Sequence, residues 1–79
     1  MKTIVRVSVT LPDCTGRVQR LHDNGSFFKL EEEWLYGEKL ADLVCKLLEQ
    51  GGHKIEQHEF IDDDDFKTKL FTRFEYISE

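Results

Sequence analysis

Four consecutive aspartates are the residues of this chain whose type and spacing most directly suggest chemistry. They occupy positions 62–65, between an isoleucine and a phenylalanine. A helix–loop–helix calcium site needs a glycine at its sixth position and a glutamate at its twelfth. Counted from Asp62, these positions hold Lys67 and Arg73, so the motif is absent. We expect a solvated turn, because adjacent carboxylates repel one another, with a looser magnesium or calcium site as the alternative.

The histidines and cysteines could supply metal ligands or a nucleophile. His53 and His58 lie five residues apart in a predicted strand, so they should point to opposite faces unless a bulge intervenes. Cys14 should be exposed in a turn, and Cys45 should be half-buried beside the apolar side of a helix. No base is placed to activate either thiol, and a zinc site that includes His22 is a minor alternative. We therefore expect no catalytic residue, cofactor or metal.

The composition is that of one small folded domain spanning residues 1–79. Hydrophobic residues make up 39% of the chain, and the aromatic residues are six Phe, two Tyr and one Trp. No segment approaches the roughly 20 apolar residues of a membrane helix. The start of the chain alternates and is interrupted by Arg6, which favours a strand over a secretory signal. We expect a cytoplasmic protein with no membrane association, whose two cysteines are free thiols.

Three strands are predicted before the helix, and the second and third of them are joined by a tight turn. Residues 3–11 alternate between apolar and polar positions. Further on, Asn24-Gly25 is a strong signal for a two-residue hairpin turn, which would pair Leu21 with Phe28. The face expected to point to the core is the one that carries Leu21, Phe28 and Leu30.

One helix is predicted between Glu38 and Gln50, where apolar residues recur at a helical spacing and Gly51-Gly52 follows as a stop. The preceding strand should continue to Tyr36, although a helix beginning near Glu31 is the alternative.

Two further strands are predicted after the helix. Residues 53–61 alternate weakly, and residues 66–77 fit either a strand or a helix. Threonine and aromatic residues in the latter segment favour the strand, which makes the aspartate run a hairpin connection. The predicted fold is α+β, with the order β-β-β-α-β-β: a mainly antiparallel sheet of four or five strands and one helix packed on one face.

Charge is distributed unevenly along the chain. The net charge is −5, and residues 31–65 carry twelve acids against three lysines, which gives −9. Such a block could steer the domain to a basic protein. The candidate partner-binding residues are Glu31, Glu32, Glu33, Glu38, Glu56, Glu59, Asp62, Asp63, Asp64 and Asp65.

The function predicted from this block is a non-enzymatic, acidic protein-interaction module. If its basic partner were a nucleic-acid-binding protein, the module would act as a stoichiometric inhibitor that mimics nucleic acid. Small acidic inhibitors encoded by phages work in this way as a class, a comparison that rests on size and charge alone.

Two other functions are alternatives to an acidic interaction module. Lys67, Lys69, Phe71 and Arg73 would share one face of the last strand, where basic and aromatic side chains could bind nucleic acid. Arg6, Arg17, Arg20 and Lys29 would extend that face if their strands are neighbours with matching parity. A homodimer or other structural oligomer is the second alternative, because exposed strand edges and many aromatic residues favour self-association.

Overall fold

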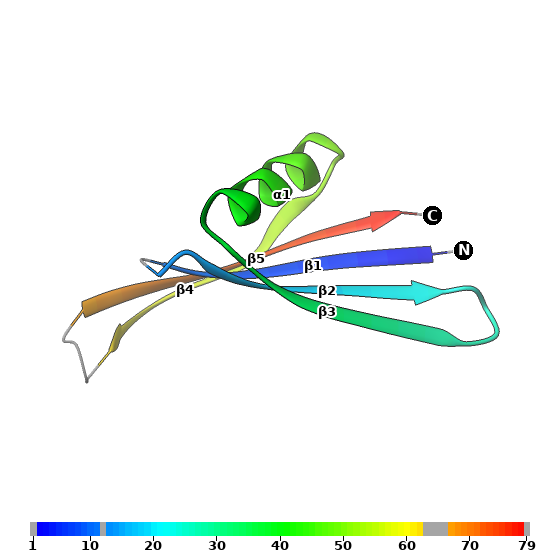
Figure 1. The fold of residues 1–79 in the computed structure, drawn as a ribbon, viewed down its shortest axis with the longest axis horizontal. Coiled ribbons are helices and arrows are strands. Elements are labelled where there is room, and N and C mark those ends of the chain that lie inside the picture. Colours follow the sequence, from blue (N-terminus) through cyan, green and yellow to red (C-terminus); the bar gives the residue numbers. More distant parts are fainter. Residues whose placement is uncertain (1, 12, 63–66, 79) are drawn as a thin grey trace.

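In the computed structural model, which describes residues 2–11, 13–62 and 67–78, five strands form one antiparallel sheet and a single helix lies across one of its faces (Figure 1). The elements are β1 (Lys2–Leu11), β2 (Thr15–Asp23), β3 (Phe28–Tyr36), α1 (Gly37–Glu49), β4 (His53–Asp62) and β5 (Lys67–Ser78). The strand order is β3-β2-β1-β5-β4, so β1 is central. The predicted α+β fold and its element order are confirmed.

The core lies between α1 and the middle of the sheet. Val7 of β1 is opposite Val18 of β2, and both side chains are fully buried. Leu40 and Leu47 of α1 cover them and are 3% exposed. Because side chains alternate along a strand, the alternation in residues 3–11 turns every second β1 side chain towards the helix.

A glycine in β2 lets the helix approach the sheet. Gly16 neighbours Val18 on the same face, and the Leu40 side chain occupies the space that a Cβ at Gly16 would need. The absence of a side chain at this position therefore determines where the first turn of α1 rests.

The helix spans Gly37–Glu49, one residue earlier at each end than the predicted range from Glu38 to Gln50. Gly37 opens it, and the backbone N–H of Gly37 donates to the carbonyl of Cys14 at 3.1 Å, which ties the helix start to the β1–β2 turn. At the other end Gly51 has φ +102°, a left-handed conformation that favours glycine. The Gly52 N–H donates to the carbonyl of Leu47 at 2.7 Å.

The hairpin between β2 and β3 turns over four residues instead of the predicted two. Asp23 is opposite Phe28, and Leu21 is opposite Leu30, so the predicted pairing of Leu21 with Phe28 is wrong. The shift is two residues, which leaves every side chain on the face it would otherwise have had.

Side-chain hydrogen bonds explain this wider turn. The Asn24 side-chain oxygen accepts from the backbone N–H groups of Ser26 and Phe27, at 2.9 and 3.1 Å. The carboxylate of Asp23 accepts from the N–H of Gly25 at 2.8 Å. These short-range bonds stabilise a turn that starts at Asn24 and does not centre on Asn24-Gly25.

The prediction of which face of β2 and β3 points to the core is also wrong. Leu21, Phe28 and Leu30 lie on the side of the sheet away from α1, and Phe28 and Leu30 are 71% and 57% exposed. The helix packs instead over Gly16 and Val18, which have the opposite parity.

A bulge in β4 changes the faces of its histidines. The register with β5 shifts between Lys54 and Glu56, so His53 is opposite Glu75 and His58 is opposite Phe71. Both histidines therefore occupy positions on the face away from α1, and the prediction that they point to opposite faces is wrong.

The strand interpretation of residues 66–77 is confirmed from residue 67 onwards, since β5 spans Lys67–Ser78.

The two thiols are free and both are exposed, so Cys45 is less buried than predicted. Among the described residues no helix has both the length and the apolar character needed to cross a membrane.

Candidate interaction surfaces

No other described element packs on the sheet face opposite α1, and we call it the open face. Three arginines lie on it: Arg6, Arg17 and Arg73. Ser8 of β1 is opposite Arg17 on one side and Arg73 on the other, and Arg6 has the same strand parity as Ser8. The structure therefore brings these three arginines together, as the nucleic-acid alternative required.

Each arginine on the open face is paired with a glutamate from a neighbouring strand. Arg6 donates to Glu75 at 2.6 and 3.1 Å. Arg17 donates to Glu32 at 2.8 Å, and Gln19 donates to the same oxygen at 2.9 Å. These cross-strand pairs balance positive charge with negative charge along the middle of the face.

Arg73 forms the third pair and also contacts an aromatic ring. Its guanidinium donates to Glu56 at 2.8 Å and to the hydroxyl of Ser8 at 3.1 Å, and its Cζ lies 5.2 Å from the centre of the Phe71 ring. His58 stacks on Phe71 with ring centres 6.1 Å apart. Most of the predicted nucleic-acid face is thus occupied by contacts within the protein.

The other basic candidates are divided between the two faces. Lys69 has the parity of Phe71 and Arg73, and its Nζ lies 3.5 Å from a carboxylate oxygen of Asp13. Arg20 and Lys29 are on the face that carries α1, so they do not extend the basic surface. The structure describes the backbone of Lys67, which begins β5.

An apolar stripe crosses the open face beside the ion pairs. Four side chains from four adjacent strands are in register across the sheet: Leu30, Leu21, Ile4 and Ile77. A hollow of about 240 Å³ lies where this stripe meets Arg6 and Gln19. This stripe was missed in the sequence because Leu21 and Leu30 were assigned to the core.

The acidic candidates on β3 do not form one surface. Glu32 is on the open face, whereas Glu31 and Glu33 are on the helix side of the sheet. Glu33 accepts from Arg20 at 2.7 Å, and Lys29 lies 3.1 Å from Glu31. The three consecutive glutamates are therefore divided between two faces, and each has a basic partner.

The remaining acidic candidates lie on α1 and β4. Glu56 pairs with Arg73 on the open face. Glu38 is exposed in the first turn of α1, where a negative charge interacts favourably with the helix dipole. Glu59 is exposed on β4, and Asp62 ends that strand. Residues 63–65, the other three aspartates, lie outside the described residues.

Hydrogen bonds lower the pKa values of three of these glutamates. For Glu32 the cause is the side-chain hydrogen bond from Gln19, followed by the one from Arg17. For Glu56 it is the hydrogen bond with His58, and the charge of Arg73 adds to it. The hydrogen bond from Lys29 lowers the pKa of Glu31. All three carboxylates are thus held in the ionised form by the sheet itself.

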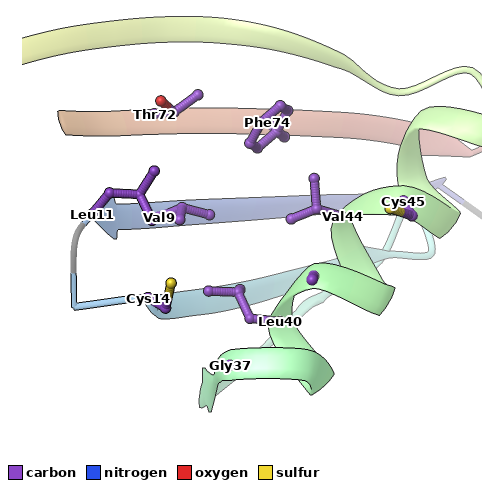
Figure 2. Close-up of a pocket in the computed structure, with 10 residues that line it drawn as sticks. Val9, Leu11, Cys14, Gly37, Leu40, Val44, Cys45, Thr72 and Phe74 are labelled. Atoms are coloured by element: carbon purple, nitrogen blue, oxygen red, sulfur yellow. The ribbon is translucent and has the colours of Figure 1, made fainter.

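A groove of about 290 Å³ opens between α1 and the sheet (Figure 2). Side chains of Val9, Leu11, Thr72 and Phe74 form its floor, those of Leu40 and Val44 form its roof, and Cys14 and Cys45 are also among its lining residues. Its described lining is mainly apolar, without the convergent polar groups that normally fix a substrate. Within residues 2–11, 13–62 and 67–78 no group of three or more His, Cys, Asp or Glu is placed to hold a metal ion.

Comparisons with known proteins give no relative from which a function could be transferred. No family model, no curated protein and no solved structure matches this chain. The functional argument therefore rests on the charges and surfaces described above.

Proposed function

We propose that this protein is a non-enzymatic interaction module that binds a basic protein through one acidic end of its sheet. We define the acidic end as Glu59, Asp62 and the aspartates at positions 63–65 that follow in the sequence. The predicted binding surface is thereby reduced from ten acids to five that are close together in the chain.

The observation that carries this proposal is the pairing of all four arginines. Each donates to a different glutamate: Arg6 to Glu75, Arg17 to Glu32, Arg20 to Glu33 and Arg73 to Glu56. These pairs cancel eight of the charges, so the net charge of −5 must come from residues outside them.

Most of that remaining charge is concentrated in one short segment of the chain. From Glu59 to Lys69 the chain carries five acids and two lysines, which gives −3. β4 and β5 extend beyond α1 at this end (Figure 1), and Glu59 is exposed there. A local negative charge at a protruding end increases the rate of encounter with a basic surface, and this attraction is screened by salt.

Binding to a nucleic-acid-binding protein remains within this proposal, since such proteins carry basic surfaces and an acidic end could compete with phosphate. The proposed compartment is the cytoplasm, where free thiols such as Cys14 and Cys45 stay reduced.

The proposal is tested by affinity capture from the source cells with the wild-type chain and two variants as bait. Changing all four residues 62–65 to asparagine should abolish capture of the specific partner, and salt should weaken the wild-type complex. The matched control changes Glu38, Asp42 and Glu49 of α1 to glutamine, which also removes negative charge, and should retain the partner. Retention by the asparagine variant together with loss in the helix variant would contradict the proposal.

Nucleic-acid binding is the second candidate, because Lys69, Phe71 and Arg73 share the open face with Trp34 and Arg17. The glutamates paired with the arginines oppose phosphate binding at this surface. A mobility-shift assay with single-stranded DNA and RNA at low salt distinguishes the candidates. A shift that Phe71→Ala and Arg73→Ala weaken would support nucleic-acid binding, and we expect none.

A further inference from the structure

Within the part of the chain that the structure describes, no helix packs on the open face. The single helix of the described chain packs over the middle of the other side of the sheet. On the open face Trp34, Leu30 and Ile77 are 59%, 57% and 45% exposed. Apolar side chains that align across four strands are normally covered by another layer of structure.

The covered side alone provides a small core. Among the described residues four hydrophobic side chains are buried, whereas eleven large hydrophobic side chains are exposed. Domains of this length often depend on additional stabilisation, and oligomerisation is one source of it. A cover that stabilises the fold must be present whenever the chain folds. A second copy of the same chain meets this condition, whereas a transient partner does not.

The size of the open face is suitable for a dimer interface. Across the strands, five strands at a spacing of about 4.8 Å give a width of about 24 Å. Along the strands, the nine residue pairs that join β1 to β2 give a length of about 30 Å. The resulting area is about 700 Å², close to the roughly 800 Å² that each partner contributes to a stable interface.

The charge of the open face also permits self-association. Its three arginines are matched by Glu32, Glu56 and Glu75, so the ion pairs contribute no net charge there. The ion pairs themselves therefore do not oppose contact between two copies at this face.

The open face has a hollow into which a side chain of a second copy could insert. The hollow of about 240 Å³ is lined by Ile4, Leu21 and Leu30 on its apolar side. Interface energy is concentrated where a large apolar side chain of one partner fills such a hollow in the other. In a two-fold dimer the same patch serves both copies.

We propose that this protein is a homodimer in which the open faces of two copies pack against each other as two stacked sheets. This arrangement leaves α1 and Glu59, which has the parity of the helix side of the sheet, outside the interface. It does not depend on the proposed function, since a monomer could bind a basic protein and a dimer could bind none.

Sedimentation velocity over a range of concentrations tests the proposal, with a matched pair of variants. The wild type should have twice the mass of the chain and should dissociate on dilution. Leu30→Lys and Ile77→Lys should each raise the dissociation constant by about 30-fold or more, because a charge then replaces an apolar contact. Leu48→Lys is the control: Leu48 is 45% exposed, as Ile77 is, but lies on α1, so this variant should remain a dimer.

The single tryptophan gives a second readout that needs no substitution. Trp34 lies on the open face and should be shielded from iodide quenching in the dimer, becoming more accessible on dilution. A wild-type chain that has the monomer mass at every concentration would overturn the proposal. So would a folded dimer that survives both lysine substitutions on the open face, or Trp34 quenching that does not change with concentration.

Discussion

At the scale of single residues, the two glycines that follow α1 have different physical roles. Gly51 is needed for its left-handed backbone, with φ +102° and open space around it. Gly52 is needed for its size: a Cβ there would lie 2.7 Å from the carbonyl oxygen of Leu47 and 3.1 Å from that of Glu75. Both of these oxygens belong to the backbone, which cannot move as a side chain can.

This difference predicts unequal effects of two neighbouring substitutions. Gly51→Ala should lower the free energy of unfolding by about 1 kcal/mol, the cost of a left-handed alanine. Gly52→Ala should lower it by more, up to about 3 kcal/mol, because the strand and the helix end must separate. Urea denaturation followed by circular dichroism measures both values. Equal losses would show that the backbone contact at Gly52 is relieved without cost.

A second residue-scale prediction concerns acid stability. The pKa of Glu56 is lowered below 4.5 in the folded protein by His58 and Arg73. Stability from this carboxylate is therefore present above pH 4.5 and is lost as the pH falls through the lower, folded-state pKa. In the Glu56→Gln variant the decline in melting temperature below pH 4.5 should be shallower than in the wild type.

The control for this experiment is Glu59→Gln, on the same strand. Glu59 forms no ion pair with a residue that the structure describes, so this variant controls for the loss of a carboxylate as such. Identical pH profiles for wild type and Glu56→Gln would mean that the ion pair does not contribute to stability.

At the scale of secondary structure elements, α1 is held to the sheet by few side chains. Leu47 is 3% exposed, whereas the next residue, Leu48, is 45% exposed. Leu47→Ala should therefore cost about 2–5 kcal/mol, and Leu48→Ala should change stability by about 0.5 kcal/mol or less. Thermal unfolding of the two variants measures the contrast. Similar melting temperatures would show that the helix does not rest on Leu47.

The sequence was sufficient to predict elements whose pattern is regular. The strict alternation of residues 3–11 predicted β1, and the helical spacing between Glu38 and Gln50 predicted α1. The weaker pattern of residues 53–61 indicated a strand, but the bulge between Lys54 and Glu56 depends on pairing with β5 and leaves no local signal.

The core face of β2 could not be predicted because β2 has apolar side chains on both sides. Val18 and Leu21 point in opposite directions, and periodicity alone does not say which of them the helix will cover. The helix lies over Val18 because Gly16, on the same face, leaves space for Leu40. The glycine was the available signal, since a glycine inside a strand marks a close approach of another element.

At the scale of the whole molecule, the charge pattern seen in the sequence is reorganised by the fold. The acidic block of residues 31–65 is divided by strand alternation, and its glutamates on β3 pair with basic residues of β2 and β3. On β3, the glutamates that the sequence presents as one negative surface are ion-paired on both faces of the sheet. Pairing between strands distant in sequence, such as Arg6 with Glu75, could not be read from the chain alone.

Binding through the acidic end and dimerisation through the open face are compatible in one molecule. The molecule measures 47 × 25 × 20 Å, and its strands extend beyond the helix (Figure 1). If two copies pack through their open faces, each dimer presents two acidic ends. Binding to a partner with two basic sites would then be strengthened by the linkage between copies.

The central claim, that the acidic end is the contact surface for basic proteins, is tested most directly by an NMR titration with a lysine-rich peptide. Backbone amide shift changes should be largest from Glu59 to Lys69, should disappear with added salt, and should be lost when residues 62–65 are changed to asparagine. Glu31, Glu32 and Glu33, which are already paired within the sheet, should move little. Shifts centred on these three glutamates, or unchanged by the asparagine substitutions, would contradict the account.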